Sequence, residues 1–356
     1  MPTKTAEAAH EHTRSAHERG LRVVAIGGGT GLSTLLKGLK RFVASTTEVA
    51  PPASDSPVIR DLCAIVTVSD DGGSSGRLRK ELNMLPPGDI RNCIVALSED
   101  EALLSKLFRH RFEKGSGLEG HSFGNLFLAA LTAITDDFSE AVRLSSEILL
   151  TRGHIYPATT SSIELEALME DGTRVLGETK ITASKGRIRE LFLVPADVGP
   201  MPQTLEAIAH ADIITIGPGS LFTSLIPNLL VRGIADAIVD SPATKVYICN
   251  LMTQANESLG RTAADHIRAL NSHARKQIFD YALINRTPVS DALKAKYATE
   301  GACQIVNDLE AVEALGAIPV LGDYLDEGDV ARHDTAQVAR DLLELPLQQL
   351  RGIRKA

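Results

Sequence analysis

The sequence has no tryptophan, only 4% aromatic residues and four cysteines among its 356 residues. The cysteines are Cys63, Cys93, Cys249 and Cys303, which are widely spaced and form no CxxC pair. Cys63 and Cys249 lie beside apolar runs, so we expect buried, reduced thiols and a cytoplasmic location.

Positive charge and long apolar runs are also scarce. Thirty-seven basic residues stand against 45 acidic ones, which gives a net charge of −8. This balance lacks the basic surface of general nucleic-acid binders and of proteins that bind anionic membranes. No apolar run approaches the roughly 20 residues that span a bilayer. We therefore expect neither nucleic acid nor a membrane as a partner.

Strand and helix patterns alternate through most of the chain. Short apolar runs rich in β-branched residues predict strands at 21–26, 62–68, 213–216, 246–249, 281–284 and 318–321. Apolar residues at helical spacing predict helices at 32–42, 91–97, 102–112, 124–134, 138–150, from 221 onward, and at 335–345. This alternation is typical of an α/β protein with a Rossmann-like, doubly wound and largely parallel sheet, whose ligands bind at the carboxyl ends of the strands.

The domain organisation follows from where this pattern changes. Residues 1–20 have no apolar segment and are expected to form a disordered tail rather than a secretory signal. We expect one domain over residues 21–345, a loop at 44–57 and a C-terminal tail at 346–356. An antiparallel excursion is predicted at about 155–195, because the Asp171-Gly172 pair is a strong hairpin-turn signal.

A glycine-rich turn follows the first predicted strand. Free N–H groups and the positive end of the helix dipole attract phosphate at such a turn. The spacing is neither GxGxxG nor the P-loop pattern, which disfavours a P-loop NTPase. A dehydrogenase would also need an acid about 20 residues further on, and Asp70 is about twice as far. The candidate binding residues are Gly27, Gly28, Gly29, Thr30, Gly31 and Ser33. The alternative is a tight turn without a ligand.

Two adjacent acids, Asp70 and Asp71, follow the second predicted strand. One carboxylate could accept a hydrogen bond from a ribose hydroxyl or hold Mg²⁺, while the following amides and Arg77 contact phosphate. The alternative is an Asx-type turn that caps the next helix. The candidate binding residues after the acids are Gly72, Gly73, Ser74, Ser75 and Arg77.

Polar residues also stand at two later predicted helix starts. In the first, Asp89 and Asn92 are candidates, with a plain N-cap as the alternative for Asp89. In the second, His121 could polarise or protonate a phosphate oxygen while Ser122 and Asn125 orient it. The alternative for His121 is a buried structural histidine.

The second half of the chain repeats the arrangement of strand, glycine turn and helix. Its candidates are Gly217, Pro218, Gly219 and Ser220, with Asn250 and residues 251–254 completing the rim. Two such turns would converge at the topological switch point of the sheet, where nucleotides bind.

A short polar segment precedes the last predicted helix. Arg332 and His333 could fold over an anionic ligand, whereas Asp334 and Gln337 fit a capping box. A phosphate on Thr335 would be favoured by the helix dipole and by the neighbouring Arg332. We therefore expect Thr335 to be a site for a Ser/Thr kinase.

These motifs together resemble one family. They are GGGTGLS at 27–33, VSDDGGSSGRLR at 68–79, PPGDIRNC at 86–93, GHSFGNLFLAAL at 120–131, IGPGSLFTSLIPNLLV at 216–231, YICNLMTQ at 247–254 and RHDT at 332–335. The chain resembles the bacterial gluconeogenesis-factor (YvcK-type) branch of the 2-phospho-L-lactate transferase (CofD-like) superfamily, over about residues 21–345.

The resemblance implies a Rossmann-like fold that binds a UDP-sugar or a dinucleotide and adjusts carbon flux, cell-wall precursor supply and cell shape. We expect a non-catalytic regulator that forms a homo-oligomer. The alternative is a Mg²⁺-dependent transferase, because related enzymes move a phospholactyl group from a guanosine diphosphate donor onto a deazaflavin. By position, Asp70 and Asp71 match the metal- and acceptor-side acids, and His121 is a further catalytic candidate. The acids here stand in DDGGSSGR rather than in the transferase branch's own acceptor pattern.

Overall fold

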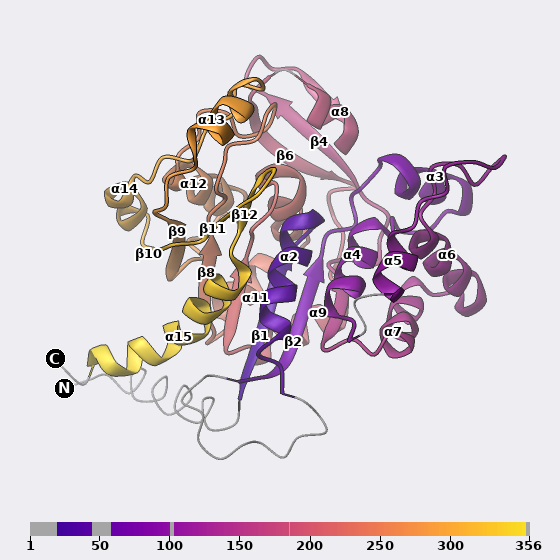
Figure 1. Cartoon of the computed structure of the whole chain (residues 1–356), viewed down its shortest axis with the longest axis horizontal. Coiled ribbons are helices and arrows are strands. Elements are labelled where there is room, and N and C mark those ends of the chain that lie inside the picture. The colour runs from indigo at the N-terminus through magenta and orange to yellow at the C-terminus, as the bar shows by residue number, and fades with distance from the viewer. Residues whose placement is uncertain (1–19, 45–57, 100–102, 185, 354–356) are drawn as a thin grey trace.

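A computed structural model describes residues 20–44, 58–99, 103–184 and 186–353 (Figure 1). The predicted tail before residue 20 and most of the predicted loop at 44–57 lie outside these residues. The cysteines in the described part are free thiols, and three of them are buried while Cys303 is exposed.

Seven parallel strands form the main sheet, in the order β10-β9-β8-β7-β1-β2-β3. They are β1 (Leu21–Gly27), β2 (Ile59–Val66), β3 (His154–Pro157), β7 (Ile213–Ile216), β8 (Thr244–Ile248), β9 (Tyr281–Asn285) and β10 (Ile318–Gly322). The central strands are almost wholly buried, as expected of parallel strands covered on both faces. The strand order reverses between β1 and β7, where the chain's two halves meet. The predicted α/β, doubly wound fold is confirmed.

The helices over the sheet are α2 (Gly29–Lys40), α3 (Gly73–Leu82), α4 (Gly88–Leu97), α5 (Leu103–Arg109), α6 (Phe123–Thr135), α7 (Phe138–Ile148), α9 (Pro202–His210), α10 (Ile226–Leu230), α11 (Ile234–Asp240), α12 (Ala263–Ala274), α13 (Asp291–Ala298), α14 (Leu309–Ala314) and α15 (Thr335–Ile353). Helix α2 forms because Leu32, Leu35, Leu36 and Leu39 share one face, which is buried. Figure 1 shows α2 lying across β1, with α4 and α15 beside it.

A small antiparallel sheet interrupts the α/β alternation. It comprises β4 (Glu164–Met169), β5 (Arg174–Leu176) and β6 (Ile188–Val194), with the short helix α8 (Glu178–Ala183). We call this unit the small sheet. The predicted hairpin turn is present, with Gly172 at a φ of +87°. The predicted excursion began too early, because β3 pairs in parallel with β2 and belongs to the main sheet.

The end of the described chain returns to the sheet. A hairpin of β11 (Leu325–Glu327) and β12 (Ala331–His333) leads into α15, which packs on α2. A Cβ on Gly38 of α2 would lie 2.3 Å from the carbonyl oxygen of Thr335, so only glycine permits this contact. Helix α15 runs through Pro346, and it therefore continues into the segment where we expected a tail.

In the part of the chain that the structure describes, no helix alone has the length and apolar character needed to cross a bilayer. The segments Leu221–Leu230 and Ile234–Asp240 reach that length and composition only as a pair, and they are bent by 79°.

Candidate functional site

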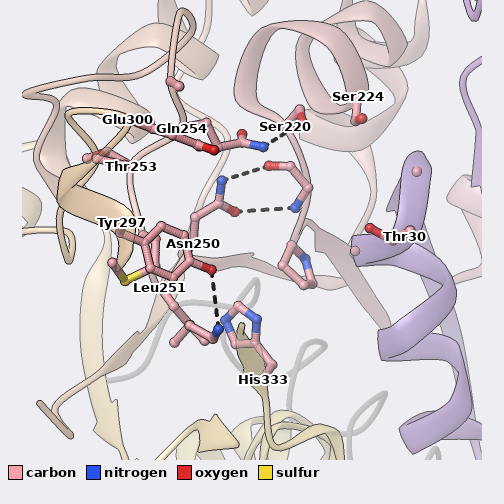
Figure 2. Close-up of a pocket in the computed structure, with 18 of the residues that line it drawn as sticks. Thr30, Ser220, Ser224, Asn250, Leu251, Thr253, Gln254, Tyr297, Glu300 and His333 are labelled. Carbon is pink, nitrogen blue, oxygen red and sulfur yellow. Dashed lines mark hydrogen bonds between the residues drawn. The ribbon is translucent and has the colours of Figure 1, made fainter. Parts of the chain in front are cut away.

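A pocket of about 450 Å³ lies beyond the carboxyl ends of β1, β7 and β8 (Figure 2). This is the switch point of the sheet, where α/β proteins of this kind bind ligands. Its lining comprises Gly28, Gly29, Thr30, Gly31, Pro218, Gly219, Ser220, Ser224, Asn250, Leu251, Met252, Thr253, Gln254, Ala255, Tyr297, Glu300, Ala302, Ala331 and His333. The two glycine turns predicted from the sequence are therefore brought together.

The first glycine turn links β1 to α2. Gly29 has a φ of +63°, which favours glycine. A Cβ on Gly31 would lie 2.3 Å from the carbonyl oxygen of Pro218 in the second turn. The glycines thus serve two purposes, a left-handed backbone and direct contact between the turns.

The N-terminus of α2 already has an anionic partner. The amide of Gly29 donates a hydrogen bond of 2.7 Å to Oδ2 of Asp89. Asp89 is not the N-cap of its own helix α4, a position that Pro87 occupies. Burial raises the pKa of Asp89 to about 6, and the nearby Asp70 adds to this rise. The Gly29 hydrogen bond and Arg91 oppose it.

The second glycine turn links β7 to the π-helical turn η1 (Leu221–Leu225) and is held by side chains. Asn250 accepts a hydrogen bond from the Gly219 amide at 3.3 Å and donates to its carbonyl oxygen at 2.8 Å. Gln254 donates to the hydroxyl of Ser220 at 2.9 Å, and Figure 2 shows both side chains directed at this turn. Behind the turn, buried Glu257 accepts from two η1 amides, at 2.7 and 3.1 Å.

The C-terminal hairpin closes one side of the pocket. Nε2 of His333 donates to the carbonyl oxygen of Cys249 at 3.0 Å. Burial lowers the pKa of His333 to about 4, so the ring is neutral at pH 7. The Tyr297 hydroxyl accepts from the amide of Ala331. Because side chains alternate along a strand, Arg332 is exposed on the other face of β12 and does not line the pocket.

Asp70 and Asp71 lie next to the first turn but face different elements. Oδ1 of Asp70 accepts from the Gly72 amide at 2.9 Å, as in an Asx-type turn. Oδ1 of Asp71 accepts from the amide and hydroxyl of Thr179 in the small sheet, at 2.8 and 2.5 Å. Next to Thr179, burial raises the pKa of Glu178 to about 9, and Asp70, Asp89, Asp71 and Glu257 reinforce this rise.

This arrangement bears on the predicted Mg²⁺ site. Among the described residues, no group of three or more His, Cys, Asp or Glu side chains is placed to hold a metal ion. Oδ1 of Asp70 and Oδ1 of Asp71 accept hydrogen bonds from different segments, Gly72 and Thr179. Magnesium binding by this pair stays a prediction.

The predicted residues around His121 form a buried network beside the pocket. The Ser74 hydroxyl shares a hydrogen bond of 2.9 Å with Nδ1 of His121, and Asn125 donates to Ser74 at 3.1 Å. Arg91 donates to Ser122 at 2.6 Å and to Asn125 at 3.1 Å. Burial lowers the pKa of His121, and the charge of Arg77 adds to this. The network joins α3, α4 and α6, and these side chains do not line the pocket.

The remaining predicted residues do not line the pocket. Gly27, Ser33, Gly72, Gly73, Ser75, Arg77, Asn92 and Gly217 are outside its lining. The side chain of Asn92 accepts from Arg91 at 2.7 Å, and Arg77 donates to the carbonyl oxygen of Glu119 at 2.6 Å. Sequence reasoning missed Ser224, although it lies within the motif at 216–231. It also missed Tyr297, Glu300, Glu178 and Glu257, for which no local motif gave a signal.

The fold and pocket define a Rossmann-like α/β protein with a pocket at the topological switch point of its sheet. Residues 23–325 match the family 2-phospho-L-lactate transferase CofD, and the chain belongs to this family.

Its relatives share one name. The chain is 51% identical over 324 residues to the gluconeogenesis factor of Halalkalibacterium halodurans, which covers 90% of this chain and 95% of that protein. It is 48% identical over 326 residues to the gluconeogenesis factor of Bacillus subtilis, over 91% and 98% of the two chains. A crystal structure of a UPF0052 family member from Bacillus halodurans superposes with a TM-score of 0.84 at 50% identity, over 91% of this chain and 99% of that one. The resemblance drawn from the motifs is confirmed.

Proposed function

We propose that this chain acts as a gluconeogenesis factor that binds a nucleotide-sugar, with UDP-N-acetylglucosamine as the first candidate. In this role it links carbon flux and cell-wall precursor supply to cell shape. The relatives' shared name supports the metabolic role, and the pocket at the switch point supports the ligand class.

The chemistry of the lining is the observation that carries the ligand proposal. Among the residues that the structure describes, the lining has no lysine or arginine, one carboxylate at Glu300 and a neutral His333. Its other polar groups are backbone amides, hydroxyls and the side-chain amides of Asn250 and Gln254. Such groups suit the many neutral hydrogen-bonding atoms of a base, a ribose and a sugar, and the volume lies within the usual range of ligand pockets, roughly 300–1,000 Å³.

Calorimetry with a matched pair of variants tests this proposal. We expect UDP-N-acetylglucosamine to bind the wild type more tightly than GDP, NAD or UMP. Gln254→Ala should weaken binding about tenfold, because the side chain lines the pocket and bonds to Ser220. Gln277→Ala, at an exposed position outside the lining, is the control. Absence of binding for all four ligands would contradict the proposal.

A transferase is the second candidate, favoured by the carboxylates of Asp70, Asp71 and Glu178 beside the first turn. This function requires turnover of a guanosine diphosphate donor in the presence of Mg²⁺. Phosphorus NMR of the donor during incubation with the protein, Mg²⁺ and a deazaflavin acceptor measures the transfer directly, with Asp71→Asn as the inactive control. An unchanged donor spectrum would exclude this reaction for the donor used.

Two expected partners also stay proposals. Formation of a homo-oligomer can be measured by sedimentation. Phosphorylation of Thr335 would place charge at the contact between α15 and Gly38 of α2, and mass spectrometry of the protein from cells would detect it.

A further inference from the structure

The carboxylate of Asp89 binds the N-terminus of α2, and helix N-termini of this kind often bind phosphate. Its Oδ2 atom accepts the Gly29 amide at 2.7 Å and lies 3.0 Å from where a Cβ on Gly28 would stand. Gly28 and Gly29 both line the pocket. A ligand atom that reached the N-terminus of α2 would therefore meet a protein carboxylate.

Two acids lie near Asp89, on segments that are distant in sequence. The charge of Asp70, from the loop after β2, raises the pKa of Asp89. Glu178, from the small sheet, has its pKa raised to about 9 and is therefore neutral at pH 7. Arg91, on the same helix as Asp89, is the opposing charge, but its guanidinium donates to Ser122, Asn125 and Asn92. Among the residues that the structure describes, no lysine or arginine lines the pocket to offset the charge of Asp70 and Asp89.

A hydroxyl would meet a different environment. A carboxylate offers about four lone-pair sites, and the Gly29 amide uses one of those on Asp89. A sugar or ribose hydroxyl can donate to a remaining site, whereas a phosphate oxygen brings like charge to it.

We propose that Asp89 is a specificity-determining residue, which excludes phosphate from the N-terminus of α2 and reserves that end of the pocket for a hydroxyl-bearing, uncharged part of the ligand. This rests on the proposed nucleotide-sugar function, and it fixes which end of such a ligand lies beside the first turn.

The test compares two variants that each remove one negative charge. Asp89→Asn keeps an oxygen for the Gly29 amide, whereas Glu300→Gln removes an exposed carboxylate elsewhere in the lining. At pH 7.5, we expect Asp89→Asn to bind inorganic pyrophosphate at least tenfold more tightly than the wild type and UDP-N-acetylglucosamine at least threefold more weakly. Glu300→Gln should change pyrophosphate affinity less than threefold. Equal gains in the two variants, or no gain in Asp89→Asn, would overturn the proposal.

Two further measurements show whether the result for Asp89→Asn comes from the lost charge or from misfolding of the variant. Asp89→Ser, which removes the charge with a shorter polar side chain, should show the same gain for pyrophosphate. In the wild type, the NMR signal of the Gly29 amide should stay in place during a pyrophosphate titration, and a saturable shift would contradict the proposal. The pyrophosphate results do not depend on nucleotide-sugar binding. Failure of the wild type to bind UDP-N-acetylglucosamine would instead count against the proposed function.

Discussion

The two glycine turns of this protein share the order of strand, glycine-rich turn and helical segment, but different side chains hold them. The first leads into the regular helix α2, whose amide at Gly29 is bound by a carboxylate from another helix. The second leads into the irregular turn η1, which is held by the neutral Asn250 in front and by Glu257 behind. A glycine-rich turn after a strand is therefore not in itself an open anion site, because side chains distant in sequence decide which amides stay available.

Substitution at the contact between the two glycine turns should cause the largest loss of stability. A methyl group at position 31 would collide with the backbone of Pro218, so Gly31→Ala should lower the free energy of unfolding by about 3 kcal/mol. Urea unfolding measures this, and Gly328→Ala serves as the control because nothing lies within 4 Å of its Cβ position. Equal effects of the two substitutions would show that the turns do not rely on this contact.

The two carboxylates that hold the turns should differ in how much they contribute to the free energy of unfolding. Glu257→Ala leaves two buried η1 amides without an acceptor and should cost about 2 kcal/mol. Asp89→Ala removes one capping interaction from α2 and should cost about 1 kcal/mol. Thermal unfolding of both variants ranks them. A larger loss for Asp89→Ala would reverse the comparison.

The free energy of unfolding should depend on pH because of Glu178. The pKa of Glu178 is raised from 4.5 to about 9 in the folded protein, so the native state binds more protons than the unfolded chain between those values. Stability therefore falls as the pH rises through this window, by roughly 1 kcal/mol between pH 6 and 9 after solvent screening. Glu178→Gln should flatten the pH profile of urea unfolding. A flat wild-type profile would rule out a buried, protonated Glu178.

The smallest effect is expected at the hairpin over the pocket. His333 lines the pocket and Arg332 does not, so His333→Ala should weaken UDP-N-acetylglucosamine binding about fivefold and Arg332→Ala less than twofold. Titration calorimetry separates the two. A comparable loss in Arg332→Ala would restore that residue to the ligand site, as the sequence suggested.

The parts of the fold with strong local patterns could be predicted from the sequence. The six apolar runs assigned to the parallel sheet are strands, and the Asp171-Gly172 turn forms its hairpin. Strand β3 was misplaced because it is short and pairs with β2 from about 90 residues away, which local periodicity does not report. Helices α3, α8, α9 and α11 to α14 were not assigned. Helix α12 carried a local signal that was overlooked, a capping box of Thr262 and Asp265.

The candidate site also has residues that local patterns predict and residues that they do not. The backbone-lined turns were found because glycine after a strand has a local meaning. Tyr297, Glu300 and His333 reach the pocket from segments after β9, and Glu178 comes from the small sheet. Only tertiary structure brings these side chains to the turns. His121 and Asn125, which the sequence places in one motif, both bond to Ser74 from another motif, in a network that does not line the pocket.

The position of β1 has a consequence for how the chain is made. This strand lies inside the sheet, between β2 and β7, yet its neighbour β7 follows some 190 residues later. At a synthesis rate of 5–20 residues per second, the ribosome exposes one edge of β1 for roughly 10–40 s before β7 exists. An apolar strand with an unpaired edge readily joins other chains during that time. Slower translation or the loss of nascent-chain chaperones should therefore reduce the yield of soluble protein more than the stability of the finished fold would suggest.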